Sequence, residues 1–147
     1  PYSIATPFLA NLLWEGLPVS DVVALVQLEA AERFLARPRT RQYGPMSVAV
    51  SLLARADLLR RVGPQVFWPV PKVESALVRV SPLDPSRARA WNAAGLPTLL
   101  RAGFRHRRKT LRKSFPESRL RAAGLDPSAR PEEVPPDGWV RLLGAAA

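Results

Sequence analysis

The sequence predicts an α/β fold, in which part of a sheet over residues 1–83 is followed by a small all-helical domain over residues 84–147. Two observations predict it. Short apolar runs typical of strands alternate with helical stretches up to Pro82, as in α/β sheets. After Pro82 the chain is rich in alanine and arginine, and repeated prolines divide it into short helices.

The chain is predicted to begin with an amphipathic helix. Thr6 is the expected N-cap and Pro7 the first helical residue, because proline fixes a helical φ and needs no backbone donor there. The helix is expected to run from Phe8 to about Glu15 and to end before Gly16.

A strand and a second helix are expected next. The continuous apolar run over residues 22–26 is typical of a buried parallel strand. Residues 29–36 favour a helix that stops before a proline. A polar, basic loop over residues 37–44 then follows.

Residues 46–59 fit a strand and a helix about equally well, because alternating apolar positions coincide with helix-forming alanines and leucines. A break is expected over residues 60–64. Residues 75–80 alternate again and predict a strand with one apolar face. That face contains Ala76, Val78 and Val80.

The charge balance points to a polyanionic partner. The chain has 22 Lys and Arg against 12 Asp and Glu, which gives a net charge of +10. A domain this basic is typical of nucleic-acid binding. The absence of cysteine and the single histidine, His106, argue against a metal centre and against a Ser-His-Asp triad.

The densest basic segment covers residues 101–121, with Glu117 as its only acid. On a helix, Arg101, Arg105, Arg108 and Arg112 would share one face, where like charges repel unless phosphates neutralise them. We therefore favour nucleic-acid contact over a merely solvated helix face. The apolar residues expected to anchor the segment to the core are Phe104, Leu111 and Phe115.

Prolines frame an aromatic pair, Phe67 and Trp68, in an extended loop. On composition alone we favour a plug at the edge of the core. The alternative is a platform on which a flipped base stacks.

Taken together, five segments resemble the adenine dimethyltransferases of ribosomal RNA. Pro1-Tyr2 resembles the end of the family's Asn-Leu-Pro-Tyr motif. The other four resemble its Gln-Lys-Glu segment, its Tyr-Gly-x-Leu-Ser-Val stretch, its Phe-x-Pro-x-Pro-Lys-Val-x-Ser loop and its Phe-x-x-Arg-Arg-Lys-Thr-Leu-Arg helix. They span residues 26–33, 43–48, 67–75 and 104–112.

The resemblance implies the C-terminal half of a Rossmann-like methyltransferase domain. It implies transfer of methyl groups from S-adenosylmethionine to adenine N6, with the adenine stacked between Tyr2 and Phe67. The Pro1 carbonyl would accept a hydrogen bond from the adenine amine and border the cofactor. The residues expected to contact phosphate are Lys72, Arg105, Arg107, Arg108, Lys109 and Arg112.

The chain departs from the family pattern at several places. It contains no glycine-rich loop after a first strand, and Leu28 stands where the family has lysine. Because the chain opens inside a motif, we expect it to be part of a longer enzyme. On its own, the chain is expected to have an open sheet edge, to expose an apolar face and to bind S-adenosylmethionine poorly.

The small-subunit branch of the family is favoured over the branch that methylates large-subunit RNA and confers macrolide resistance. A non-catalytic RNA-binding module is the other alternative. The expected partner is ribosomal RNA within a small-subunit precursor, in the cytoplasm, with no membrane and no metal.

Overall fold

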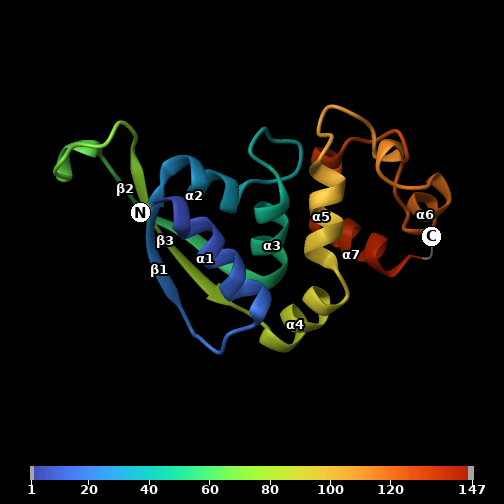
Figure 1. The fold of residues 1–147 in the computed structure, drawn as a ribbon, viewed down its shortest axis with the longest axis horizontal. Helices are drawn as coiled ribbons and strands as arrows, with labels where there is room; N and C mark the ends of the chain where they lie inside the picture. Colours follow the sequence, from blue (N-terminus) through green and yellow to red (C-terminus); the bar gives the residue numbers. More distant parts are fainter. Residues whose placement is uncertain (1, 146–147) are drawn as a thin grey trace.

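The computed structural model describes residues 2–145, with side chains from residue 4 onward (Figure 1). Pro1 and the side chain of Tyr2 therefore lie outside the described residues. Helices and strands alternate in the first part and helices fill the second. In chain order they are α1 (Tyr2–Glu15), β1 (Val22–Gln27), α2 (Leu28–Leu35), α3 (Pro45–Leu53), β2 (Ala54–Val62), β3 (Ser75–Pro82), α4 (Pro85–Ala93), α5 (Leu96–Phe104), α6 (Glu117–Ala122) and α7 (Pro136–Gly144).

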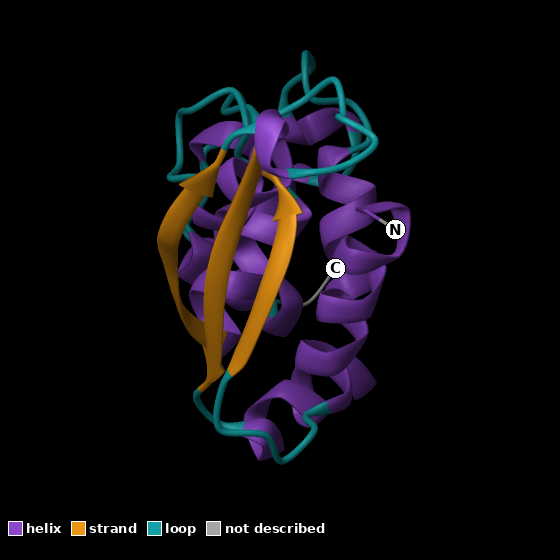
Figure 2. Ribbon diagram, turned by 90° about the vertical axis from the view of Figure 1, so that its left-hand side faces the viewer, coloured by secondary structure: helices purple, strands orange, loops and turns teal. Residues whose placement is uncertain are grey.

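The three strands form one sheet in the order β1-β3-β2, and both pairings are antiparallel (Figure 2). The prediction of a parallel strand over residues 22–26 was therefore wrong for the strands described. An apolar run is ambiguous because it also arises where one face of a strand is left open. Here Val23 and Leu25 point away from the helices and are 53% and 37% exposed.

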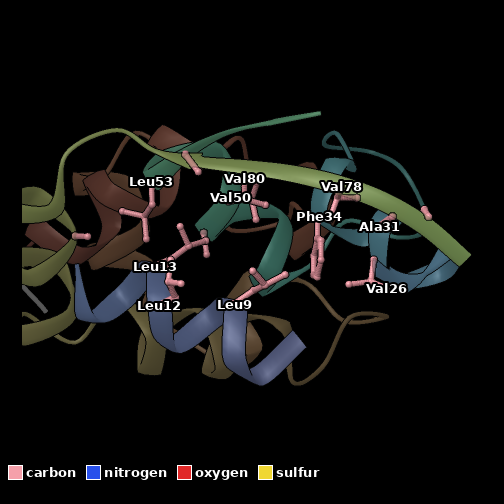
Figure 3. Packing of buried hydrophobic residues seen from close by; sticks show 14 residues of the cluster. Leu9, Leu12, Leu13, Val26, Ala31, Phe34, Val50, Leu53, Val78 and Val80 are labelled. Atoms are coloured by element: carbon pink, nitrogen blue, oxygen red, sulfur yellow. The ribbon is translucent and has the colours of Figure 1, made fainter. Parts of the chain in front are cut away.

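The first core lies between the other face of the sheet and helices α1, α2 and α3 (Figure 3). The predicted alternation in β3 is confirmed, because Ala76, Val78 and Val80 are at most 1% exposed. Helix residues from three elements close over them. They are Leu9, Leu12, Leu13, Ala31, Phe34, Val50 and Leu53.

Helix α1 begins earlier than expected. It already includes Tyr2, so Thr6 is not its N-cap and Pro7 lies inside the helix. Proline removes one backbone hydrogen bond in such a position. The buried stripe of Leu9, Leu12 and Leu13 nevertheless places the helix firmly on the sheet.

The ambiguous stretch after residue 45 contains both elements in succession. Residues 45–53 form α3, and Ala54 starts β2. The consecutive residues 47–50 of α3 are all buried, because this helix packs against both hydrophobic clusters of the protein. The predicted break at 60–64 was too long, since β2 continues to Val62 with a register shift between Leu58 and Arg60. Of the predicted break, only Gly63 and Pro64 lie outside the strand.

A second core joins the helical tail to the segment before α3. Trp139 is fully buried beside Phe104, with ring centroids 5.0 Å apart. Tyr43 and Val48, which precede residue 84, belong to this same cluster. The boundary at residue 84 stays a prediction, and the second core extends across it.

The Tyr43 hydroxyl donates a hydrogen bond of 2.6 Å to the buried carbonyl of Val134. Burial raises the pKa of this phenol, so that it keeps its proton and its role as a donor. Tyr43→Phe leaves the carbonyl unsatisfied, and we expect the free energy of unfolding to fall by about 1–3 kcal/mol. Urea unfolding followed by far-UV circular dichroism measures this, and an unchanged midpoint would contradict it.

Candidate nucleic-acid interface

The basic segment follows α5, but it is not the continuous helix that the spacing predicted. Helix α5 ends at Phe104, residues 105–109 form turns, and a short 3₁₀ helix covers Leu111–Lys113. The arginines therefore do not share one helical face. Two physical reasons act together: like charges at helical spacing repel, and Leu111 must reach the second core.

The segment divides into free and paired cations. Arg105, Arg108 and Lys109 are exposed, and the structure gives their side chains no hydrogen bond or ion pair among the described residues. Arg107, in contrast, donates to the Arg41 carbonyl at 2.9 Å, and Arg112 lies 3.5 Å from Glu117. Unpaired cations are free to bind phosphate, so the first three form the strongest part of the predicted interface.

Apolar and backbone contacts fix the position of this segment. The predicted anchors Phe104, Leu111 and Phe115 are confirmed, each at most 7% exposed. The Leu111 amide also donates to the Ala129 carbonyl at 2.8 Å. The cations therefore project from a loop that is anchored at both ends, which lowers the entropy lost on binding.

Figure 1 shows that the loop between β2 and β3 extends beyond the sheet on the left. Phe67 is half-buried on extended backbone, whereas Trp68 is 93% exposed. The core-plug interpretation was therefore wrong for Trp68. Lys72 is also exposed and has no side-chain partner among the described residues.

The structure does not bring all predicted site residues together. In Figure 1 the β2–β3 loop lies at one end and the segment after α5 lies above that helix, on the other side of α3. Helix α1 begins toward the end of the sheet from which the loop extends. The predicted sandwich of an adenine between Tyr2 and Phe67 stays a prediction, because the Tyr2 side chain and Pro1 are outside the described residues.

A cleft of about 970 Å³ lies between α1, α2, α3 and α5. Arg101 and Arg107 of the predicted basic segment line it, together with two arginines that had not been assigned to a site, Arg33 and Arg41. The same walls carry Glu15, Glu29 and Glu32. Because acids and bases are mixed around the cleft, it suits a phosphate backbone less well than the free cations after α5.

The described residues do not fit a cradle for S-adenosylmethionine. Such a cradle needs a glycine-rich turn between a strand and a helix. Here β1 passes directly from Gln27 to Leu28 of α2, and β3 reaches α4 through Leu83 and Asp84, all without glycine. Leu28 is half-buried against the first core, which is a packing role.

Two solved structures are similar to this chain in fold. The fold is similar to that of a crystallised dimethyladenosine transferase from Plasmodium falciparum, with a TM-score of 0.82, 22% identity and coverage of 99% of this chain and 66% of that chain. It is less similar to the 23S rRNA methyltransferase ErmE, with a TM-score of 0.58, 24% identity and coverage of 98% and 61%. Both likenesses concern the α/β fold alone.

The chain belongs to the ribosomal RNA adenine dimethylase family, whose model matches residues 1–145. Proteins named ribosomal RNA small subunit methyltransferase A are similar over nearly all of it. The relative from Chromobacterium violaceum is 38% identical over 97% of this chain and 56% of its own length. The relative from Hydrogenovibrio crunogenus is 36% identical over 97% and 55%. The chain thus spans about half the length of these curated relatives.

The family is one of methyltransferases, whose ordinary methyl donor is S-adenosylmethionine. Among the residues that the structure describes, no helix is long and apolar enough to cross a membrane.

Proposed function

We propose that this chain is the target-base and RNA-contact part of an enzyme that dimethylates adenine N6 in small-subunit ribosomal RNA, with S-adenosylmethionine as methyl donor. The observation that carries the proposal is the anchored group of free cations, Arg105, Arg108 and Lys109, in a member of this family. The names of the curated relatives support the small-subunit substrate. The proposal places the enzyme in the cytoplasm, acting on a small-subunit precursor.

Each group has a separate task in this proposal. The free cations and Lys72 neutralise phosphates and set the register of the RNA, because phosphate contacts position a nucleic acid without reading its bases. Arg107 and Arg112 contact phosphate only if they exchange their present partners for it. Phe67 offers its ring to the target adenine, opposite Tyr2, and the Pro1 carbonyl accepts from the adenine amine. Positioning of this kind supplies most of the rate gain where the base needs no further activation.

Two alternatives make different predictions. A large-subunit methyltransferase would prefer a different RNA hairpin, whereas the curated relatives are named for the small subunit. A non-catalytic RNA-binding module would bind RNA but contribute nothing to turnover when Phe67 is changed.

The test of the proposal is RNA binding by the purified chain over a series of salt concentrations. The probes are a hairpin from the end of small-subunit RNA and a scrambled sequence of equal length. We expect steeply salt-dependent binding, because phosphate contacts release counterions, together with a preference for the hairpin. Binding that ignores salt, or no binding by a folded chain, would reject the proposal.

A separate prediction concerns the cofactor. Because the described residues contain no glycine-rich turn after a strand, we expect calorimetric titration of this chain with S-adenosylmethionine to show no micromolar binding. Micromolar binding with a stoichiometry of one would contradict this and would place the methyl-donor site within these residues.

A further inference from the structure

The tip of the β2–β3 loop carries an aromatic side chain that the fold does not use. Trp68 is 93% exposed, which is the largest exposure among the large apolar side chains of the described residues. Val66, Val70 and Val73 beside it are 63%, 61% and 45% exposed. A tryptophan in this setting stabilises nothing in the described structure, so its ring is available to a ligand.

The loop presents this ring from a fixed backbone. Pro64, Pro69 and Pro71 restrict the chain on both sides of Trp68. At the base, the Glu74 carbonyl accepts a hydrogen bond of 3.0 Å from the Leu28 amide. Binding therefore costs less conformational entropy than it would on an unrestrained loop.

Phe67 and its neighbour Trp68 differ in exposure. Phe67 has φ −110° and ψ 152°, which is extended backbone. The Phe67 side chain is half-buried and the Trp68 side chain is 93% exposed, so we assign Trp68 to a base other than the one assigned to Phe67.

The charged residues in the loop and at the adjoining end of β2 indicate the kind of partner. Arg60, Arg61 and Lys72 are exposed without side-chain partners among the described residues, and Glu74 is the only acid between residues 60 and 75. An exposed aromatic ring with free cations in the adjoining segments is typical of surfaces that bind single-stranded nucleic acid, since bases stack and phosphates are neutralised.

We propose that Trp68 is a second stacking platform, which holds an unpaired base of the RNA other than the target adenine, with Arg60, Arg61 and Lys72 on the adjoining phosphates. This inference rests on the proposed function, because it assigns the RNA a second contact near the same loop. It adds a requirement that the free cations after α5 do not impose: the RNA must be unpaired where it meets the loop.

The experiment uses the 147-residue chain and two fluorescein-labelled probes, a short single-stranded oligoadenylate and a fully paired RNA duplex, followed by anisotropy. The variants are Trp68→Leu, which keeps apolar bulk but removes the flat ring, and Trp68→Phe, which keeps a ring. Phe8→Leu is the matched control, since Phe8 is an aromatic residue on α1 that is 59% exposed. Circular dichroism verifies that all variants keep the fold.

We expect Trp68→Leu to weaken oligoadenylate binding by about tenfold, whereas Trp68→Phe keeps most of it. Duplex binding should stay unchanged, as should both affinities of Phe8→Leu. Wild-type affinity in Trp68→Leu, an equal loss for the duplex, or an equal loss in Trp68→Phe would each overturn the inference. Loss of self-association in Trp68→Leu with unchanged RNA affinity would assign the ring to a protein contact and overturn it as well.

The double variant Arg108→Gln, Lys109→Gln separates this inference from the proposed function. If the double variant loses affinity for both probes and Trp68→Leu for neither, the proposed function stands and the stacking platform does not. If Trp68→Leu alone loses oligoadenylate affinity, the platform stands and the role of the cations after α5 fails. A folded wild-type chain that binds neither probe overturns both.

Discussion

Trp139→Ala is expected to lower the free energy of unfolding by about 3–5 kcal/mol, the range for removing a large aromatic side chain from a core. Trp139 is fully buried, and its ring packs on Phe104. Gly103 makes room for the ring, because a Cβ atom at that position would overlap it. Because the ring fills the space beside Gly103, its removal leaves a cavity, which adds to the cost of losing the buried surface.

Function should fail together with stability in this variant. Leu111 and Phe115 hold the basic segment against the same core as Trp139. When that core loosens, the free cations lose their fixed positions, and we expect RNA affinity to fall at temperatures where the first core is still folded.

Two variants serve as controls for the Trp139 prediction. Trp139→Phe should cost less than Trp139→Ala, because it keeps an aromatic ring in the core. Trp68→Ala should change stability by no more than about 0.5 kcal/mol, since Trp68 is exposed. The measurement is urea unfolding followed by far-UV circular dichroism. Equal midpoints for Trp139→Ala and Trp68→Ala would refute the prediction.

Local patterns predicted much of the fold. The period-two alternation over residues 75–80 correctly gave β3 and its buried face, because a strand places alternate side chains on one side. The apolar anchors Leu111 and Phe115 were also recognisable, since they interrupt a run of charges. In both cases the information lies in neighbouring residues.

Strand direction and core membership were not predictable in the same way. Whether β1 runs parallel or antiparallel depends on β3, which lies some fifty residues later in the chain. Tyr43 lies in a polar loop, yet its partner Val134 comes from the far end of the sequence. Local residue propensities carry no information about such long-range contacts, because tertiary packing decides them.

The candidate site, like the fold, was predicted only in part from the sequence. Motif likeness selected Phe67 and the cations after α5, but it could not distinguish the free Arg108 from Arg107, which binds the Arg41 carbonyl. Nor did composition reveal that Trp68 is exposed, because an aromatic residue between prolines fits a core plug equally well. Only the placement of the loop beyond the sheet settles that question.

Removing both Arg108 and Lys109 is expected to weaken hairpin RNA binding by about 25- to 60-fold at 0.1 M salt. Each lost phosphate contact lowers the slope of log affinity against log salt by about 0.7–0.9. Because the logarithm of 0.1 is −1, each lost contact also lowers the logarithm of the affinity at 0.1 M salt by about 0.7–0.9. Two lost contacts therefore weaken binding by about 25- to 60-fold. The effect requires both cations to face phosphate, as their exposure and lack of side-chain partners allow.

The matched control is Arg55→Gln, Arg79→Gln, which lowers the net charge of +10 by the same two units. Arg55 and Arg79 are exposed on β2 and β3, away from α5, so they report the general effect of charge. We expect this control to keep the wild-type slope within about half a unit, because distant surface charges are screened at moderate salt. If both double variants lose affinity equally, net charge rather than a defined interface governs binding, and the assignment of the segment after α5 is wrong.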